Sequence, residues 1–433
     1  MRILIVGNGG REHALLWKLR RDDPDARFFV TRPNGGMSGL CEPVGIAPSD
    51  TEALAGWAAS RRIDLTVVGP EGPLAAGVAD RFRAKGLLVF GPSREAARIE
   101  ASKAFSKDLM REAGVPTAEY RTFTDHDAAR DYVREVGAPV VVKASGLAAG
   151  KGAVVCSTVD EALGAVATMM RDLAFGEAGR RVVIEAFMRG EEVSVFGITD
   201  GEDVIQLLPS QDHKRVGEGD TGPNTGGMGA YTPVSVATRQ FLQESRDRVF
   251  LPTLRALAER GTPFQGLLYA GLMLTDDGLE VVEFNCRFGD PEAQVVLPMM
   301  ESSLLELLIA VAEGSPIRDR SVRWRGGAAL TTVLASEGYP GPYEKGKTIE
   351  LPGESDDVIL FHAGTAEVEG RIVTTGGRVL AATGLGASLE AAADASRMAA
   401  EAVRFEGKQF RRDIGWRELE RTAVPAAQGP LGD

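Results

Sequence analysis

Three polar side chains stand at alternate positions near the end of a strand-like run from Leu279 to Arg287. Successive side chains of a strand point to opposite faces, so Glu283, Asn285 and Arg287 share one face. A carboxylate and an amide oxygen are hard ligands of the kind that Mg²⁺ accepts, with water and phosphate oxygens completing its shell. The run therefore predicts a metal site built from Glu283 and Asn285.

Arg287 extends this polar face by one position. Its planar guanidinium can bind a substrate carboxylate or phosphate through two parallel hydrogen bonds. A half-buried edge strand with a solvated polar face is the alternative interpretation of the same pattern. We favour the metal site, because a phosphate-type loop and several lysines lie upstream in the sequence.

A glycine-rich turn, Gly7-Asn-Gly-Gly-Arg-Glu-His13, follows the first apolar run of the chain. It fails the dinucleotide-binding pattern, because the third glycine of that pattern falls at Glu12 and no acidic residue ends the second strand near Thr31. A glycine turn that enters a helix N-terminus still favours an anion. We predict a single phosphate here rather than a plain strand-to-helix turn, since Arg11 lies in the first helical turn, where the dipole disfavours a cation.

The segment 143–153 has the outline of a phosphate-binding P-loop but departs from it at two positions. Ser145 stands where that motif needs its leading glycine, and Gly152 replaces the hydroxyl residue that would hold Mg²⁺. Because the segment lies between two predicted strands, we expect a flap whose backbone N–H groups cover phosphates.

Lysines near this flap are candidates for phosphate contacts. Lys143 ends an apolar strand and is predicted to reach the α- or β-phosphate of a nucleotide. Lys103 is a second candidate, whereas Lys107 is expected to lie at the surface.

Two further segments carry polar residues suited to substrate binding. The run 182–192 is predicted as a strand that leaves into a connector, where a purine can bond exposed backbone and Glu185 or Glu192 can reach an amine or a ribose. The run 210–231 is a long Gly-rich loop, and such loops are usually functional or disordered. Its charged residues are predicted substrate contacts: Asp212, Lys214 and Arg215.

The composition is that of a multi-domain globular protein, with 433 residues, 44% of them hydrophobic and 25% charged. A net charge of −12 argues against a general nucleic-acid or anionic-membrane surface. Three dispersed cysteines and four histidines without ligand spacing predict reduced thiols in a cytoplasmic protein, with neither a disulfide framework nor a zinc site. The first residues are too short an apolar run for a signal peptide, and no window is long enough to span a membrane.

Strands and helices alternate along the first part of the chain. Strands are predicted at 2–6, 27–30, 65–68 and 87–90, with helices at 11–21, 52–61 and 74–84. This alternation predicts a doubly wound parallel sheet, in which ligands bind beyond the carboxyl ends of strands. One long helix is predicted from Ser93 to Ala113, stopped by Gly114 and Pro116.

The pattern changes after this helix. Strands are predicted at 120–123, 139–143, 153–156, 181–185 and 193–198, with helices from Asp127, after a capping box at Thr158, and near 238–260. The final hundred residues or so combine short strands and glycine turns, at 328–334, 362–368 and 378–383, with an Ala-rich helix after Ser388.

These segments together closely resemble the glycinamide ribonucleotide synthetase (phosphoribosylamine–glycine ligase) family, ATP-grasp enzymes of purine biosynthesis. The resemblance covers almost the whole chain. The loop that ends at Tyr231 and the run from Glu283 are its most specific parts. The matching segments are Gly7–His13, Val68–Glu71, Lys143–Gly152, Gln211–Arg215, Asp220–Tyr231, Glu283–Glu292 and Phe361–Thr365.

The resemblance implies an α/β fold in three parts. They are an N-terminal doubly wound parallel-sheet domain at 1–100 that binds substrate phosphate, a two-lobed ATP-grasp domain at 101–320 with its small lobe at about 117–190, and a small C-terminal mixed β domain at 321–425. It also implies the reaction. ATP converts glycine to glycyl phosphate, and 5-phosphoribosylamine displaces the phosphate to give glycinamide ribonucleotide and ADP.

Site residues follow from the matching motifs. Catalysis is assigned to Arg287, Asp212 and Lys143, and the metal, Mg²⁺ or Mn²⁺, to Glu283 and Asn285. The predicted ATP contacts are Lys103, Lys143, Gly146, Gly150, Lys151, Gly152, Glu185, Phe187 and Glu192. The predicted contacts to glycine and phosphoribosylamine are Asn8, Gly10, Glu71, Asp212, Lys214, Arg287, Gly289 and Asp290.

The chain departs from the family at Ser145, which replaces an aspartate, and at Ala186, which replaces a second glutamate. Another ATP-grasp carboxylate–amine ligase would share the flap and the metal strand without the loops at 211–215 and 220–231. An ATP-binding protein without catalysis would not need Glu283, and a nicotinamide dehydrogenase is disfavoured by Glu12. We predict a monofunctional, monomeric cytoplasmic enzyme with neither nucleic-acid nor membrane partners.

Overall fold

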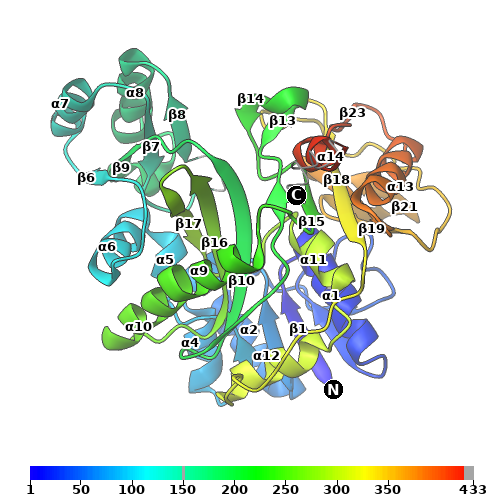
Figure 1. Ribbon diagram of the computed structural model, residues 1–433. Coiled ribbons are helices and arrows are strands. Elements are labelled where there is room, and N and C mark those ends of the chain that lie inside the picture. The colour runs from blue at the N-terminus through cyan, green and yellow to red at the C-terminus, as the bar shows by residue number, and fades with distance from the viewer. Residues whose placement is uncertain (149–151, 424–433) are drawn as a thin grey trace, which may run out of the picture.

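The computed structural model describes residues 1–148 and 152–423. The larger sheets of this part of the chain form its framework (Figure 1). One lies near the N-terminus, two lie in the middle of the chain and one lies towards the C-terminus. No helix among the described residues is long and apolar enough to cross a membrane.

The N-terminal sheet has parallel strands in the order β3-β2-β1-β4-β5, which confirms the predicted doubly wound arrangement. Its strand order reverses between β1 and β4, and ligands of such sheets bind in the crevice at that point. The elements are β1 (Arg2–Val6), α1 (Gly10–Asp22), β2 (Arg27–Val30), β3 (Glu42–Pro43), α2 (Thr51–Arg61), β4 (Leu65–Val68), α3 (Glu71–Ala75), α4 (Val78–Ala84) and β5 (Val89–Phe90).

Two helices predicted in this region are divided in the structure. The helix expected at 74–84 breaks at Gly77, whose φ of +82° no L side chain adopts readily. The helix expected at 93–113 breaks into α5 (Arg98–Ala101) and α6 (Lys103–Ala113). Ser102 between them is extended, and its hydroxyl accepts the Phe105 N–H at 3.3 Å as an N-cap. The prediction of one helix was wrong because it missed this cap.

A small antiparallel sheet in the order β6-β9-β7-β8 forms a lobe with its own apolar core (Figure 1, upper left). Its helices contribute Ala129, Val133 and Ala162 to that core. The elements are β6 (Tyr120–Phe123), α7 (His126–Val136), β7 (Val140–Ala144), β8 (Ala153–Cys156), α8 (Val159–Val166), η1 (Ala167–Arg171), η2 (Gly176–Arg180) and β9 (Val182–Ala186).

A second antiparallel sheet, in the order β11-β10-β16-β17, runs through the middle of the molecule (Figure 1). Its apolar residues join those of the N-terminal sheet in two shared cores. The elements of this region are β10 (Glu191–Thr199), β11 (Val204–Gln206), α9 (Arg239–Ser245), η4 (Arg246–Phe250), α10 (Leu251–Glu259), β16 (Gly266–Thr275), β17 (Gly278–Asn285), α11 (Ala293–Met299) and α12 (Leu304–Glu313).

The C-terminal sheet has the order β12-β15-β18-β22-β19, with β23 on β18. Its elements are β12 (Gln211–Asp212), β15 (Gly229–Thr232), β18 (Ala328–Ser336), β19 (Val358–His362), β22 (Arg378–Gly386), α13 (Leu389–Ala402), β23 (Lys408–Gln409) and α14 (Trp416–Ala423). Strands β12 and β15 come from the segment predicted as part of the ATP-grasp domain, so two predicted domains share this sheet. The boundary at residue 320 stays a prediction.

Two hairpins stand apart from the larger sheets. One, β13 (Arg215–Gly217) and β14 (Thr221–Asn224) with η3 (Glu218–Asp220) between them, gives order to the long Gly-rich loop. The other pairs β20 (Thr365–Val368) with β21 (Arg371–Thr374). The strand expected at 362–368 is therefore interrupted, because β19 ends at His362 and Gly364 lies tightly against Gly376.

Two buried histidines join the N-terminal region to the C-terminal sheet. The backbone N–H of His362 in β19 donates to Nδ1 of His13 in α1 at 2.9 Å. Asn34 donates to the carbonyls of His362 and Asn8, at 2.7 and 2.9 Å. Burial lowers the pKa of His13 to about 3 and that of His362 to about 4, so both rings are neutral near pH 7.

This contact predicts a loss of stability in mild acid. Each histidine has a pKa in the folded state below its ordinary value of 6.5. Its contribution to the free energy of unfolding is therefore complete above pH 6.5 and falls as the pH drops towards 4. At pH 5 we expect a loss on the order of 2 kcal/mol per histidine. Thermal unfolding midpoints measured between pH 8 and pH 5 test this.

The matched variants are His13→Gln and His126→Gln. Glutamine can still accept the His362 N–H but does not titrate, so His13→Gln should flatten the pH dependence. His126 lies in α7 of the small lobe, away from this contact, and its variant should follow the native curve. An unchanged slope in His13→Gln would show that His13 does not cause it.

Candidate active site

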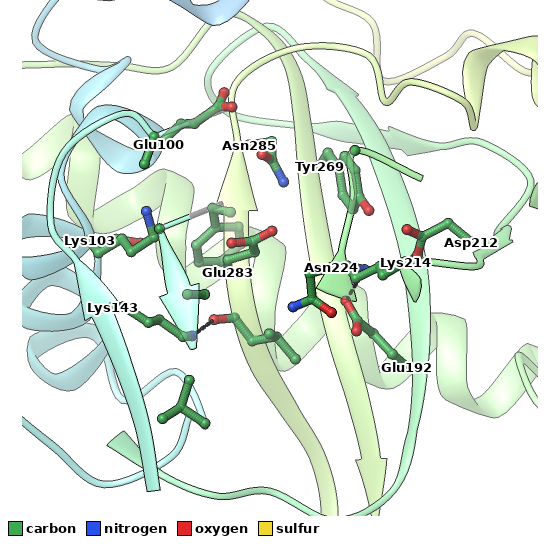
Figure 2. Close-up of a pocket in the computed structure, with 18 of the residues that line it drawn as sticks. Glu100, Lys103, Lys143, Glu192, Asp212, Lys214, Asn224, Tyr269, Glu283 and Asn285 are labelled. Carbon is green, nitrogen blue, oxygen red and sulfur yellow. Dashed lines mark hydrogen bonds and ion pairs between the residues drawn. The ribbon is translucent and has the colours of Figure 1, made fainter. Parts of the chain in front are cut away.

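One cavity of about 500 Å³ lies between the small lobe, the middle sheet, the N-terminal region and the C-terminal sheet. Figure 2 shows its polar side chains, with Lys103 and Lys143 on one side, Glu192, Asp212 and Lys214 on the other, and Glu283 between them. The N-terminal region contributes residues at the carboxyl end of β4, where the strand order reverses. The predicted site residues in its wall are Glu71, Lys103, Lys143, Gly152, Glu185, Phe187, Glu192, Asp212, Lys214, Glu283, Asn285, Arg287 and Asp290.

The end of β17 brings Glu283 and Asn285 to this cavity. Glu283 is opposite Gly271 of β16, and Asn285 is opposite Tyr269. A carboxylate oxygen of Glu192 and the Cγ of Glu283 both lie beside Gly271, so the two side chains border the same part of the sheet. Glu283 and Asn285 offer two oxygen ligands on one face, which fits a divalent cation that takes its other ligands from phosphate and water. The described residues contain no cluster of three or more acidic, histidine or cysteine ligands.

An irregularity in β17 gives Lys143 a backbone hydrogen-bond acceptor, in addition to the Glu185 carboxylate. The pairing of β16 with β17 shifts register between Gly271 and Leu272, which leaves Val282 without an opposite residue. The Val282 carbonyl accepts a hydrogen bond from Nζ of Lys143 at 3.1 Å. A β-bulge thus turns a backbone acceptor towards the cavity and ties the small lobe to β17.

Glu185 holds two buried lysines. Its Oε2 is 2.9 Å from Nζ of both Lys143 and Lys107, and all three side chains are at most 6% exposed. Burial would lower the pKa of Lys143, but Glu185 and Glu283 outweigh it and raise that pKa. Burial lowers the pKa of Lys107 to about 8. The expectation that Lys107 lies at the surface was wrong, since the carboxylate of β9 draws it inward.

Lys103, at the start of α6, faces the same region of the cavity. Its Nζ donates to the Gly146 carbonyl at 3.4 Å, and its backbone N–H donates to the Ser145 carbonyl at 2.7 Å. Burial lowers the pKa of Lys103, while Glu283 opposes that shift. The helix break at Ser102 is therefore what places this lysine beside the base of the predicted flap.

Arg287 is surrounded by carboxylates before any substrate arrives. Its guanidinium donates to Glu100 at 2.9 Å, to Glu71 at 3.3 Å and to the amide oxygen of Asn285 at 3.1 Å. Burial would lower the pKa of Arg287, but Glu100 and Glu71 raise it. Glu100 also accepts the Cys286 N–H at 2.8 Å. The guanidinium of Arg287 is thus fixed at the junction of the N-terminal region and β17.

Apolar side chains line the side of the cavity formed by the small lobe. Leu147, Val155 and Phe187 are 36%, 39% and 38% exposed, which is unusual for large hydrophobic residues. Such an uncovered apolar wall suits a flat aromatic ring with polar edges. Exposed Ala186, at the end of β9, lines the same wall.

The opposite side of the cavity is charged. Nζ of Lys214 is 2.7 Å from Glu192 and 2.9 Å from Asp212 (Figure 2). Burial would lower the pKa of Lys214, yet Asp212 and Glu192 raise it well above its ordinary range. Burial raises the pKa of Glu192. The predicted substrate residues Asp212 and Lys214 therefore form one ion-paired group with a predicted ATP residue.

The glycine turn after β1 is filled by the chain itself. The Glu12 carboxylate folds back to accept the Gly9 N–H at 2.5 Å and lies 2.5 Å from Nε of Arg11. Its side chain also lies against Gly69 at the end of β4. An internal carboxylate thus takes the anion position that we expected for a phosphate, and Arg11 is its counter-ion.

Several predicted site residues lie elsewhere. Asn8 is exposed, and Gly10 packs against Gln294 and Asp290. Gly289 lies against the Glu292 carboxyl, and neither it nor Gly146 lines the cavity. Gly150 and Lys151 fall outside the described residues. These assignments remain predictions.

The cavity also contains residues that motif reasoning missed. Arg378 of β22 reaches from the C-terminal sheet to the Asp290 carbonyl at 2.7 Å and to its carboxylate at 3.4 Å. Glu100, Tyr269 and Glu292 line the wall as well. Glu292 stands in the run from Glu283 and could have been found there. The others carry no local signal, because distant contacts alone bring them to the cavity.

Together these groups can carry out phosphoryl transfer to a small acid. The lysines and the Glu283–Asn285 pair can neutralise a polyphosphate whose base lies on the apolar wall. The charged side can hold a second and a third polar reactant within the same enclosure.

Comparison with known proteins identifies the family. Residues 1–100, 101–293 and 329–417 match the N domain, the ATP-grasp (A) domain and the C domain of phosphoribosylglycinamide synthetase. The chain is 49% identical to phosphoribosylamine–glycine ligase of Pseudomonas aeruginosa, over 97% of this chain and 99% of that protein. It is 47% identical to the Rhizobium meliloti protein of the same name, over the same shares of each chain.

Solved structures support the same family assignment. The crystal structure of phosphoribosylamine–glycine ligase from Thermotoga maritima has a TM-score of 0.82 at 32% identity, over 96% of this chain and 100% of that chain. A biotin carboxylase from Campylobacter jejuni has a TM-score of 0.74 at 16% identity, over 97% of this chain and 95% of that chain, and shares the fold alone. The chain belongs to the phosphoribosylamine–glycine ligase family.

Proposed function

We propose that the protein joins glycine to 5-phosphoribosylamine with cleavage of ATP, giving glycinamide ribonucleotide, ADP and phosphate for purine synthesis. The observation that carries this proposal is the continuity of the cavity. One enclosure joins an apolar wall, buried lysines and the Glu283–Asn285 pair to a charged side built by the middle and C-terminal sheets. A nucleotide and two small polar reactants therefore share one space.

ATP lies with its adenine on the apolar wall and its phosphates towards the lysines. Phe187 and Val155 are exposed at that wall and gain burial when a ring covers them. Lys143, held by Glu185, and Lys103 meet the phosphates. Gly146, Gly150, Lys151 and Gly152 belong to the flap that closes over them, and Glu192 lies near the ribose.

A divalent cation, Mg²⁺ or Mn²⁺, is held by Glu283 and Asn285. Both are oxygen ligands that line the cavity at the end of β17. When bound, the cation neutralises charge on the phosphate oxygens during transfer. The small number of protein ligands suits Mg²⁺, which keeps water and phosphate in its shell.

The reaction proceeds in two transfers. A glycine carboxylate oxygen attacks the γ-phosphorus and releases ADP, which yields glycyl phosphate. The amine of phosphoribosylamine then attacks the glycyl carbonyl carbon, the C–N bond forms, and the C–O bond to phosphate breaks. Arg287 holds the glycine carboxylate and its phosphorylated form, while Asp212, Lys214 and Asp290 position the sugar amine.

A different ATP-grasp carboxylate–amine ligase is the competing function. The ordered segments that carry Asp212, Lys214 and Asn224 to the cavity argue against it, since they match the family beyond the shared ATP fold. A non-catalytic ATP-binding protein is the other alternative. The Glu283–Asn285 pair and the lysines that line the same cavity argue for turnover.

The reaction is tested by following ADP release with ATP, Mg²⁺ and glycine, with and without phosphoribosylamine formed in situ from ribose 5-phosphate and ammonia. We expect sustained release only when both glycine and the sugar amine are present. Release with a different acid or amine would move the protein to another ligase activity. Bound ATP without any release would favour the non-catalytic alternative.

Glu283→Gln is expected to lower kcat by at least about 100-fold, because the amide keeps the shape but removes the charged cation ligand. Binding of Mn²⁺ in the presence of ADP, followed by electron paramagnetic resonance, should weaken in parallel. Glu280→Gln, on the same strand but outside the cavity wall, is the matched control. Native kcat and native Mn²⁺ affinity in Glu283→Gln would remove this residue from the cation site.

Lys143→Ala is expected to raise the KM for ATP by about tenfold to a hundredfold, since a charge-assisted contact contributes about 1.5–3 kcal/mol. Lys107 remains to pair with Glu185, so the buried carboxylate keeps one counter-ion. Lys85→Ala, which changes an exposed lysine of the N-terminal region, controls for loss of positive charge. An unchanged KM for ATP in Lys143→Ala would exclude a phosphate contact.

A further inference from the structure

The amide-forming step needs a base, and none of the residues assigned so far supplies one. As the amine attacks glycyl phosphate, its nitrogen becomes positively charged and must lose a proton before the amide is complete. A carboxylate can take that proton if it lies in the cavity and titrates near neutral pH. The carboxylates of Glu71, Glu100, Glu185 and Asp212 are each bound to cations.

We propose that Glu292 is the general base of the ligation step. It lines the cavity on the side of Asp212 and Lys214, at the N-terminal end of α11, and only 4% of the residue is exposed. Unlike those carboxylates, it has no lysine or arginine within ion-pair distance among the described residues. The assignment rests on the proposed function, since it concerns the second transfer of that reaction.

Tyr269 fixes one oxygen of this carboxyl group. Its hydroxyl donates to Oε1 of Glu292 at 2.8 Å, and Ser194 Oγ lies 2.8 Å from the same hydroxyl. The main chain of Gly289 lies directly against the other side of the group, where a Cβ would collide with Oε2. Oε1 is thus held by Tyr269, while Oε2 lies against the main chain of Gly289.

The position of Tyr269 relates the base to the metal strand. Tyr269 is opposite Asn285 in the pairing of β16 with β17 (Figure 2). The Tyr269 hydroxyl contacts Glu292, so Tyr269 connects the proposed base to Asn285, a predicted cation ligand. When the phosphate of glycyl phosphate lies at Glu283 and Asn285, its carbonyl carbon lies towards Asp212 and Lys214. An amine that attacks this carbon from that side meets Glu292.

The surroundings of Glu292 match the task. Burial raises the pKa of Glu292 to about 7, and the nearby Asp212 carboxylate adds to the rise. Lys214 and the Tyr269 hydroxyl oppose it without reversing it. The titratable and charged groups that face it from neighbouring elements are Asp212, Lys214, Tyr269, Arg287 and Arg378. Asp212 is the weaker candidate, because protonating it would break its ion pair with Lys214.

In this step the amine nitrogen forms a bond to the glycyl carbonyl carbon, and the carbonyl electron pair moves to oxygen. The N–H proton passes to the Glu292 carboxylate. The electron pair then returns, the C–O bond breaks, and phosphate leaves with the electrons of that bond. Glu292 releases its proton to solvent after product departs.

Glu292→Gln separates this role from phosphoryl transfer. Ligation should fall by about 100-fold or more. The first half-reaction should persist, measured as glycine-dependent exchange of ¹⁸O between the β-nonbridging and βγ-bridging positions of ATP, with ribose 5-phosphate in place of the amine. Glu301→Gln, an exposed glutamate, is the control for both rates.

Three results would overturn the assignment. Native ligation in Glu292→Gln would exclude the base, and equal loss of exchange and ligation would make Glu292 a structural or substrate-holding residue. If the native protein shows ligation without glycine-dependent exchange, the glycyl phosphate route fails, and the role of Glu292 fails with it. That last result leaves the overall ligase activity in place, so the two failures are distinguishable.

Tyr269→Phe provides a test that does not depend on Glu292→Gln folding. Without the hydroxyl, the ionised carboxylate loses a hydrogen bond, so the pKa of Glu292 should rise by about one unit. The native rate of ligation should increase through pH 7 as the base ionises, and this rise should move to higher pH in Tyr269→Phe. An unmoved profile, or a rate that falls through pH 7, would contradict the proposal.

Discussion

Buried charge has to be compensated, and this constraint organises the whole site. Burial destabilises the ionised form of an ammonium or carboxylate that lacks a partner of opposite charge. Here Glu185 pairs with two lysines, Arg287 with two glutamates, and Lys214 with Asp212 and Glu192. Each cation is therefore oriented by a carboxylate, which holds the site in place ahead of its substrates.

The same pairs connect elements that are distant in the sequence. Lys143 of the small lobe donates to the Val282 carbonyl in the middle sheet. Arg287 contacts Glu71 of the N-terminal region, and Arg378 of the C-terminal sheet contacts Asp290. The cavity thus exists only when all four regions are assembled, so the contacts that complete it also help to join the regions.

The arrangement separates two chemical tasks within one enclosure. Phosphoryl transfer needs positive charge around the nucleotide, which the lysines and a cation on Glu283 and Asn285 would supply in the proposed reaction. Amide formation needs a group that takes up a proton, away from that positive charge. Glu292 lies on the side of the cavity where the other carboxylates are engaged in ion pairs. Positioning and electrostatics therefore account for both steps without a covalent protein nucleophile.

The parallel N-terminal sheet, the polar face of β17 and the lysine near the end of β7 could be predicted from the sequence, because alternating apolar patterns and short polar motifs are local. It did not predict the burial of Lys107, the break at Ser102, or the return of Glu12 into the glycine turn, since a partner far along the chain or a single capping bond decides each. Tertiary structure alone brought Glu100, Tyr269 and Arg378 to the cavity. Their neighbours in sequence carry no pattern, because strand pairing, hydrogen bonds and ion pairs between distant residues place them.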